Sequence, residues 1–341
     1  MSMTIGVDPH KASHTAVAID GDEHPLARVT VTADRGQTQR LLAWAEPLGV
    51  ERTWAIECAT GLGRLLAQQL VAAGENVVDV PPILAARVRL LGSTKASKND
   101  PNDALATAIA GLRHCGLRAV AVDDHTAVLR MLADRHEDLT SLRTQAACRL
   151  HAVLRELLPG GAPLRLSADR AGLMLRGVRT EDVVAIERKR LARDHLVDIR
   201  RLDRDIAAMR ARITDAVISS GTTLTDLYGV GPITAALILG QVGDPARFRT
   251  RHQFASYNGT APIEASSGPR VRHRLNPRGN RTLNHAVHMI AVTQIGHDTP
   301  GRAYYLRRQA EGKTPKEALR ALKRRVSDTV WRQLQVDLAN R

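Results

Sequence analysis

The sequence predicts an α/β N-terminal domain, a long helical middle and a mainly α-helical C-terminal domain that ends in a basic tail. Short apolar runs separated by turn residues fill the first third, two stretches without Pro or Gly follow, and Arg-rich segments dominate the end. We place the three domains at residues 1–122, 123–220 and 221–341. A chain of 341 residues is long enough to give two or three domains a buried core.

The N-terminal third has the pattern of strands joined by tight turns, then helices between further strands. Residues 4–8 (TIGVD), 14–19 (HTAVAI) and 27–33 (ARVTVTA) predict an antiparallel meander. Pro81 and Pro82 end the last predicted strand because proline cannot donate to a sheet. The other predicted elements are helices at 37–48 and 61–73, strands at 53–57 and 76–80, and helices from 83 and at 102–112.

The middle of the chain has helical periodicity over two long stretches, 129–158 and 181–218, with the segment PGGAP after the first. In the second stretch, apolar residues recur at alternating three- and four-residue steps, which is the heptad pattern of a coiled coil. These residues are Ile199, Leu202, Ile206, Met209 and Ile213. The pattern fits an antiparallel arm that pairs protomers, and equally a helical bundle within one protomer.

The balance of charge predicts a polyanionic partner. The formal net charge is +14, and from about residue 245 basic residues clearly outnumber acidic ones. An Arg-rich genome would explain part of this excess. The Gly229-Val230-Gly231 turn before an apolar helix is typical of a helix-hairpin-helix element that holds a phosphate, although a turn between core helices has the same composition.

Cysteine usage and hydropathy indicate a cytoplasmic protein. Cys58, Cys115 and Cys148 form no C-x-x-C pair, which argues against a disulfide or zinc framework. The first residues, MSMTIGVDPHK, lack the apolar run of a signal peptide. The sequence also lacks the 18 or more consecutive apolar residues of a membrane span, so we expect no membrane partner.

Four carboxylates predict a divalent metal site. Asp8 and Glu57 each end a predicted strand, and Asp100 and Asp103 lie three residues apart at a helix start, so both face the same way. Mg²⁺ prefers oxygen ligands, and two such ions can clamp the attacking and leaving oxygens of a phosphodiester. Three strands followed by a helix, with an acid on the first strand, is the layout of the ribonuclease-H-like nuclease fold.

Each acid taken alone also has a structural explanation. Asp100 and Asp103 are favoured by the helix macrodipole, and Asp8 can cap a turn. Their joint placement at strand ends and at one helix start favours the metal site.

The segments GVDPHK, AIECATG, KNDPNDA and APIEASSG, followed by RHRLNPRGNRTLN, resemble the DEDD transposases of insertion-sequence family one-ten, which are bridge-RNA-guided recombinases. The resemblance covers nearly the whole chain. It implies a RuvC-like N-terminal domain, a helical middle and a C-terminal transposase domain. It also implies that Asp8, Glu57, Asp100 and Asp103 are catalytic and bind Mg²⁺.

The resemblance further implies a catalytic serine at Ser267, in the Ser267-Gly268 step, with Ser266 as the alternative. The chain departs from the family at LNPRGN, where the family often has Ser-Lys before the basic residue and Gly. A hydroxyl can attack a DNA phosphodiester and hold the broken end as a phosphoserine ester; on the residues alone, SSG would be a turn. The basic side chains expected to contact phosphates are Arg270, Arg272, Arg274, Arg278, Arg281, Lys323, Arg324 and Arg325.

The implied function is that of an insertion-sequence transposase or recombinase that cleaves and exchanges double-stranded DNA. In the family, a guide (bridge) RNA pairs with donor and target, so the protein reads backbone shape and charge. Protomers are then expected to form a homo-oligomer, a dimer and a tetramer on DNA. The alternatives are a RuvC-like Holliday-junction resolvase or nuclease that uses metal-activated water without Ser267, and a non-catalytic nucleic-acid scaffold.

Overall fold

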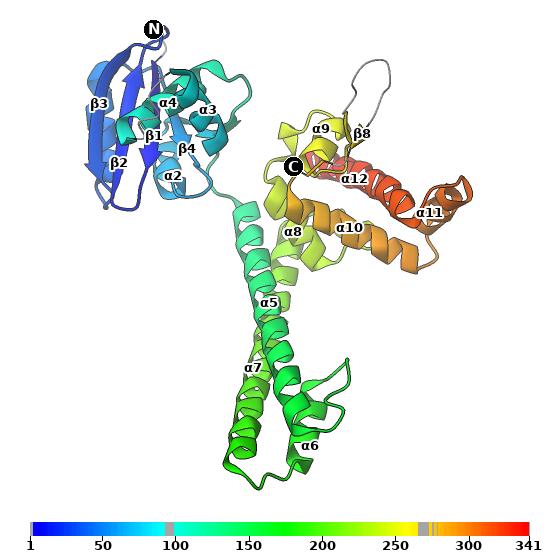
Figure 1. Ribbon diagram of the computed structural model, residues 1–341. Coiled ribbons are helices and arrows are strands. Elements are labelled where there is room, and N and C mark those ends of the chain that lie inside the picture. The colour runs from blue at the N-terminus through cyan, green and yellow to red at the C-terminus, as the bar shows by residue number, and fades with distance from the viewer. Residues whose placement is uncertain (1–2, 93–98, 265–272, 275, 278, 341) are drawn as a thin grey trace. The chain divides into compact units, whose positions relative to one another are not determined.

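The structure is a computed structural model that describes residues 3–92, 99–264, 273–274, 276–277 and 279–340. It divides into two compact units, Met1–Asp123 and Asp124–Arg341 (Figure 1). The boundary placed at residue 220 lies inside the second unit, and the three-part division stays a prediction. Among the described helices, none combines the length and apolar content that crossing a membrane requires.

The first unit is built on a mixed six-stranded sheet with the order β3-β2-β1-β4-β5-β6. Strands β1, β2 and β3 form the predicted antiparallel meander, β4 and β5 run parallel to β1, and β6 pairs antiparallel with β5. This confirms the α/β prediction for the N-terminal part. The strands are β1 (Met3–Pro9), β2 (Ser13–Ile19), β3 (Pro25–Thr32), β4 (Arg52–Glu57), β5 (Asn76–Val80) and β6 (Arg118–Ala119).

Helices cover both faces of this sheet. On one face, α1 (Gln37–Ala45, continued by a 3-10 turn at Glu46–Leu48) and α2 (Arg64–Ala72) pack on a core that includes Val7 and Ile56. On the other face lie α3 (Pro82–Gly92) and α4 (Asp100–Arg113). Strands β1 and β2 are buried on both faces, which explains why they appear in the sequence as nearly continuous apolar runs.

Helix α4 lies with its backbone directly on β1. A Cβ at Gly6 would stand 2.1 Å from the carbonyl oxygen of Ala104, and a Cβ at Gly111 would stand 2.5 Å from the Cβ of Ala55 on β4. Only glycine permits such an approach of helix to strand. The consequence is that the N-terminal turn of α4 lies close to the end of β1.

The second unit begins with two long helices, α5 (His125–Leu157) and α7 (Val183–Ser219), joined through α6 (Ala168–Gly177). The ion pairs Arg143–Asp203, 2.6 Å between Nε and Oδ1, and Arg188–Glu156, 2.7 Å between Nε and Oε2, show that α5 and α7 run antiparallel. Helix α6 was not predicted.

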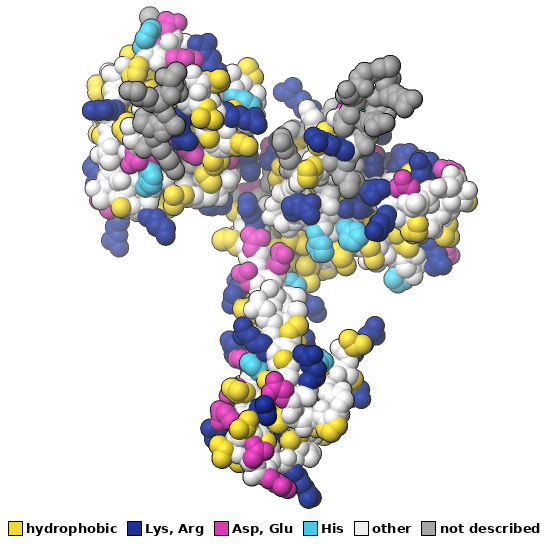
Figure 2. All heavy atoms as spheres, viewed as in Figure 1, with side chains coloured by type: hydrophobic (Ala, Val, Ile, Leu, Met, Phe, Trp, Pro, Cys, Tyr) yellow, Lys and Arg dark blue, Asp and Glu magenta, His cyan; other side chains and the backbone are white. Residues whose placement is uncertain are grey.

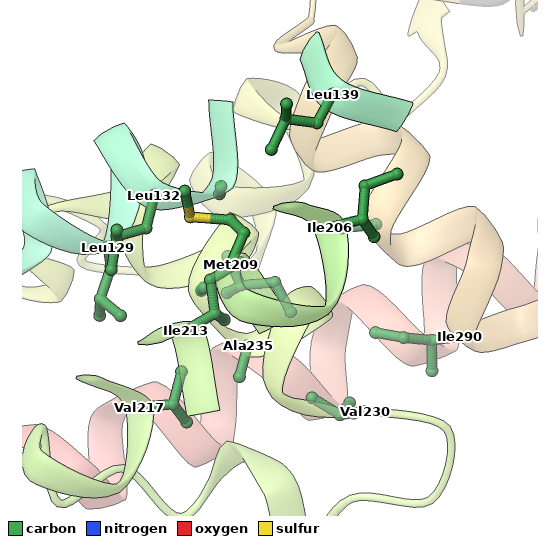
Figure 3. Packing of buried hydrophobic residues seen from close by; sticks show 14 of the residues in the cluster. Leu129, Leu132, Leu139, Ile206, Met209, Ile213, Val217, Val230, Ala235 and Ile290 are labelled. Atoms are coloured by element: carbon green, nitrogen blue, oxygen red, sulfur yellow. The ribbon is translucent and has the colours of Figure 1, made fainter. Parts of the chain in front are cut away.

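The apolar seam of α7 packs on α5 of the same chain. Ile206, Met209 and Ile213 are buried in one cluster with Leu132 and Leu139 of α5 (Figure 3). The sequence pattern fitted both pairing of protomers and a bundle within one protomer, and in the structure α5 of the same chain covers the seam. The helical bundle within one chain therefore accounts for the heptad pattern, and pairing of protomers stays a prediction.

The remaining helices of the second unit continue the same core. Capping boxes at Thr250 and Thr314 fix the starts of two of them, because the threonine side chain and a Gln or Glu three residues later bond each other's backbone N–H. The elements are α8 (Pro232–Val242), α9 (Arg251–Tyr257), β7 (Ile263–Glu264), β8 (His273–Arg274), α10 (Arg281–Gly296), α11 (Pro300–Ala310), α12 (Pro315–Ala339) and 3-10 turns at Leu224–Asp226 and Pro245–Arg247.

Candidate active site

Asp8 and Glu57 stand side by side at the ends of two neighbouring parallel strands. Val7 of β1 pairs with Ile56 of β4, so the two acids occupy the next position of the register. Val7 and Ile56 belong to the core under α1 and α2. Because side chains alternate along a strand, Asp8 and Glu57 project to the other face, which α4 covers.

The turn after Glu57 is sharp and held by backbone hydrogen bonds. Cys58 has a positive φ of 53°, a left-handed conformation that is uncommon for a residue with a Cβ. Its N–H donates to the carbonyl of Val80 at 3.0 Å, and its own carbonyl accepts from the N–H of Gly61 at 2.9 Å. These bonds fix the point at which the chain leaves the sheet directly after the Glu57 carboxylate.

The N-terminus of α4 brings Asp100 to this edge of the sheet. Asn99 caps the helix, since its side-chain oxygen accepts the backbone N–H of Asn102 at 2.9 Å. Within the described part of the chain, ligand atoms of Asp8, His10 and Asp100 all lie within 4.8 Å of one another. Carboxylate oxygens and an imidazole nitrogen at such separations can bind one divalent cation.

Asp8 is the buried member of this group, with an exposed fraction of 8%, whereas His10 and Asp100 are exposed. The Nδ1 of His10 lies 3.7 Å from Oδ2 of Asp8. His10 was not predicted from the sequence. The signal that could have found it is the Asp8-Pro9-His10 spacing, because residues two apart at a strand end face the same side.

Asp103 lies one helical turn after Asp100 and points to a different partner. It is buried, and it forms an ion pair with Arg89 of α3. The guanidinium supplies the positive charge that a buried carboxylate requires. The group of three described above contains neither Asp103 nor Glu57. The structure thus joins two of the four predicted acids, Asp8 and Asp100, to a histidine.

The predicted serine site lies largely outside the described residues, and this holds for Ser266, Ser267, Arg270, Arg272 and Arg278. Residues on both sides of that segment are nevertheless tied together. The N–H of Asn280 donates to the carbonyl of Tyr257 at 2.7 Å. A Cβ at Gly279 would stand 2.5 Å from the Cα of Gly259, so the two backbones cross in contact.

Asn258 fixes one side of this crossing. It is fully buried, and its side-chain amide donates to Oγ of Ser327 on α12 at 2.8 Å. Its carbonyl accepts from the side chain of Asn284 on α10 at 2.7 Å. Lys323 in turn donates to Oδ1 of Asn284 at 2.6 Å. Burial, and then the neighbouring charge of Arg281, lower the pKa of Lys323.

The predicted basic residues therefore fall into two groups. Arg274, Arg281 and Arg325 are exposed. Lys323 is half-buried, and Arg324 forms an ion pair with Asp328 at 3.2 Å. In Figure 2, Lys, Arg and His side chains gather over α10. This surface of the second unit can attract an anionic polymer.

Similarity to known proteins extends over almost the whole chain. A family model described as a transposase, for DEDD transposases of the IS110 type, matches residues 5–159. The model of the transposase IS116/IS110/IS902 family matches residues 221–306. The chain is 30% identical to the 42 kDa protein of insertion element IS900 from Mycobacterium paratuberculosis, over 97% of its own length and 95% of the relative.

Two further proteins are similar at lower sequence identity. The 44.8 kDa protein of insertion element IS116 from Streptomyces clavuligerus is 27% identical over 97% of this chain and 94% of the relative. Among solved structures, T. thermophilus RuvC in complex with a Holliday junction substrate aligns with 35% of this chain and 100% of its own, at 19% identity and a TM-score of 0.29. With two family models matched and the IS900 protein aligned from end to end, this chain belongs to the IS110 family of insertion-sequence transposases.

Proposed function

We propose that this transposase cleaves and rejoins DNA at a divalent metal centre held by Asp8 and Asp100, with Glu57 and Asp103 at its border and Mg²⁺ as the ion. The observation that supports the proposal is the approach of Asp8 to the first turn of α4, where ligand atoms of Asp8, His10 and Asp100 lie within 4.8 Å of one another. A bound divalent cation would stabilise negative charge on the attacking and leaving oxygens of a phosphodiester.

Neighbouring residues hold the carboxylates of this centre in place and balance their charge, which favours binding of a divalent cation. Gly6 allows α4 to lie on β1, and this contact keeps the carboxylate of Asp100 near that of Asp8. Arg89 forms an ion pair with the buried Asp103, one helical turn after Asp100. The positive end of the α4 dipole reduces the repulsion between carboxylates gathered at one edge of the sheet.

We further propose that Ser267 is the nucleophile, as in the family that the chain resembles. Its hydroxyl oxygen would form a bond to phosphorus as one bridging P–O bond of the DNA breaks, and the hydroxyl proton would pass to the leaving oxygen. The phosphoserine ester conserves the bond energy for rejoining. Selection of donor and target would rest with a guide RNA, and the serine would meet the acidic centre of another protomer in the oligomer.

The metal centre is tested by binding and by cleavage together. Mn²⁺ binding to the full chain is measured by electron paramagnetic resonance without DNA, and strand cleavage of insertion-element ends is measured in Mg²⁺ with and without chelator. We expect Asp8→Asn and Asp100→Asn to lose both signals. Asp22→Asn, an exposed acid in the turn after β2, should keep both. Unchanged Mn²⁺ affinity in Asp8→Asn would contradict the centre.

The serine step is tested separately by denaturing electrophoresis of the protein with labelled DNA. A covalent adduct that maps to Ser267 and disappears in Ser267→Ala supports it. Cleavage without any adduct would favour hydrolysis by metal-activated water instead, as in a junction resolvase.

A further inference from the structure

A cavity of about 340 Å³ lies in the second unit between α10, α11 and α12, with the loop before α8 as a further wall. Its floor is aliphatic, because Ile290 of α10 and Leu322, Val326 and Val330 of α12 are buried. Protein sites for small ligands have volumes of about 300–1,000 Å³ and apolar floors with few polar groups. The cavity is therefore large enough for one flat ring system, and too small for the face of a helix.

Two tyrosines line this cavity. The chain has only four tyrosines, so two at one site is a concentration of the aromatic surface it possesses. Tyr228, in the loop before α8, is 51% exposed, and Tyr304 of α11 is half-buried. An exposed aromatic ring beside an apolar cavity is the surface on which an unpaired nucleobase stacks.

The arrangement of the walls is fixed by Gln294 of α10. Its side-chain amide donates to the carbonyl of Tyr228 at 3.0 Å, which ties the loop to α10. Its Oε1 lies so close to Gly301 that a Cβ there would stand 2.2 Å away, which ties α10 to the start of α11. The cavity is thus formed before any ligand arrives, and a preformed site loses little free energy to ordering on binding.

Positive charge surrounds the Tyr304 side of the cavity. The guanidinium carbons of Arg307, Arg308 and Arg325 lie 5.2, 5.3 and 5.8 Å from the centre of the Tyr304 ring. Arg307 and Arg308 share one carboxylate, Glu311, at 3.8 and 2.6 Å. Three cations therefore face one anion.

Arg325 is the cation best placed for a ligand. It is exposed and lines the cavity, and no carboxylate of the described residues lies within 4.0 Å of it. Burial raises the pKa of the Tyr304 hydroxyl, but hydrogen bonds from Arg308 and Arg325 outweigh this and lower it. The rim can therefore receive an anionic group next to the apolar floor.

We propose that this cavity holds one unstacked nucleobase of a nucleic-acid strand, with the adjoining phosphate on Arg325 and Arg308. A flat ring joined to an anion matches an apolar slot with a cationic rim, and the net charge of +14 favours a polyanion as its source. The proposal rests on the proposed action on DNA. It adds a site in the second unit that contacts a base instead of the backbone alone.

The test compares two fluorescent single-stranded decamers, decathymidylate and a decamer of abasic sites, by anisotropy with the full chain. We expect decathymidylate to bind roughly 5- to 150-fold more tightly, the range for stacking of one base. Tyr228→Ser should remove most of this difference and leave the affinity for the abasic decamer unchanged. Arg325→Gln should weaken both decamers, whereas Arg320→Gln, which removes a charge from an exposed position of the same helix, should change neither more than twofold.

Photocrosslinking locates the base. A decamer with one 5-iodouracil should crosslink to Tyr228 or Tyr304, and a crosslink confined to other residues would overturn the proposal. Repeating the titration with decauridylate distinguishes a guide RNA from a DNA strand as the source of the base. Tighter binding of decauridylate than of decathymidylate indicates RNA, and the reverse indicates DNA. Equal binding of the two DNA decamers, with metal-dependent cleavage intact, would overturn the cavity site alone. Failure to bind either decamer would also overturn the cavity site, whereas loss of metal-dependent cleavage by the wild-type chain would overturn the proposed function.

Discussion

Gly6 of β1 lies in backbone contact with Ala104 of α4, so that a Cβ at Gly6 would stand 2.1 Å from the Ala104 carbonyl oxygen and 2.3 Å from the backbone nitrogen of Ala108. Nothing flexible can give way, because both neighbouring atoms belong to the helix backbone. This contact connects the fold to the chemistry, since it sets the distance between Asp8 at the end of β1 and Asp100 at the start of α4.

We expect Gly6→Ala to displace α4 and to separate the two carboxylates. Overpacking of this kind costs about 1–3 kcal/mol of unfolding free energy. The affinity for Mn²⁺ should fall as well, because the ligands no longer converge. Urea unfolding and Mn²⁺ titration measure the two effects. Gly21→Ala is the matched control, since a Cβ there meets no atom within 4 Å. Retention of wild-type Mn²⁺ affinity in Gly6→Ala would show that α4 does not set the site.

Ile206→Asp separates packing within the protomer from pairing between protomers. Ile206 is 7% exposed and belongs to the cluster shared by α5 and α7. A charge there has no partner, so we expect a loss of several kcal/mol of stability in the second unit at any protein concentration. Val197→Asp, at a position of α7 that is 63% exposed, should have little effect. The check is thermal unfolding at two concentrations together with sizing. A folded monomer of Ile206→Asp would restore the seam as a dimer interface.

The stability of the first unit should depend on the protonation of His14. This residue is 5% exposed, and its Nε2 lies 2.9 Å from Oε1 of Gln37. The Gln37 amide nitrogen donates to Gln69, so Oε1 accepts and Nε2 of His14 carries the proton. The buried Nδ1 has no hydrogen-bond partner among the described residues. Burial, above all, lowers the pKa of His14 below its usual 6.5.

The lowered pKa of His14 determines how the stability of the first unit changes with pH. Because the folded pKa is lowered, the neutral form is favoured by folding, and the unfolded chain takes up the proton first. Stability is therefore complete above pH 6.5 and is lost as pH falls from 6.5 toward the folded pKa. The urea midpoint of the first-unit transition should drop between pH 7.5 and 5.5, and drop less in His14→Gln. The same change at the exposed His24 should leave the wild-type slope. An identical pH slope in His14→Gln would exclude this residue as the cause.

Much of the first unit could be predicted because its signals are local. Apolar runs bounded by turn residues gave five strands and the helices between them. The edge strand β6 was missed because its two residues, Arg118 and Ala119, carry no periodicity. Helix α6 was missed because it is only ten residues long and contains two glycines, Gly172 and Gly177, so its helical periodicity is short and interrupted.

The candidate site was only partly predictable for a related reason. Strand ends and a helix start placed Asp8, Glu57, Asp100 and Asp103 at one edge of the sheet. The pairing of Asp103 with Arg89, however, depends on how α3 packs against α4, which no local pattern encodes. The heptad of α7 likewise indicated a dry face but not which helix covers it. Periodicity identifies a buried surface, and only the tertiary fold identifies the partner.

Removing Arg89 from the Arg89–Asp103 ion pair tests whether the Asp103 carboxylate binds the metal. Arg89→Met leaves a buried carboxylate without its counter-charge, and breaking such a pair costs about 3–5 kcal/mol, less here because the Arg89 side chain is 29% exposed. If Asp103 contributes to the centre, a divalent cation can replace the lost charge. Saturating Mn²⁺ should then stabilise Arg89→Met more than it stabilises the wild-type chain, by linkage of binding to folding.

The measurement is urea unfolding of both chains with and without Mn²⁺, and Arg87→Met, at an exposed position of the same helix, serves as the control. A second variant tests whether the unpaired carboxylate of Asp103 causes the extra stabilisation by Mn²⁺. Adding Asp103→Asn to Arg89→Met removes the unpaired charge, so it should recover stability without metal and abolish the extra stabilisation by Mn²⁺. Equal stabilisation of wild type and Arg89→Met by Mn²⁺ would instead show that Asp103 pairs with Arg89 and does not bind the metal. The metal would then be held by Asp8, His10 and Asp100, and the buried ion pair would serve to fix α3 against the helix that carries Asp100.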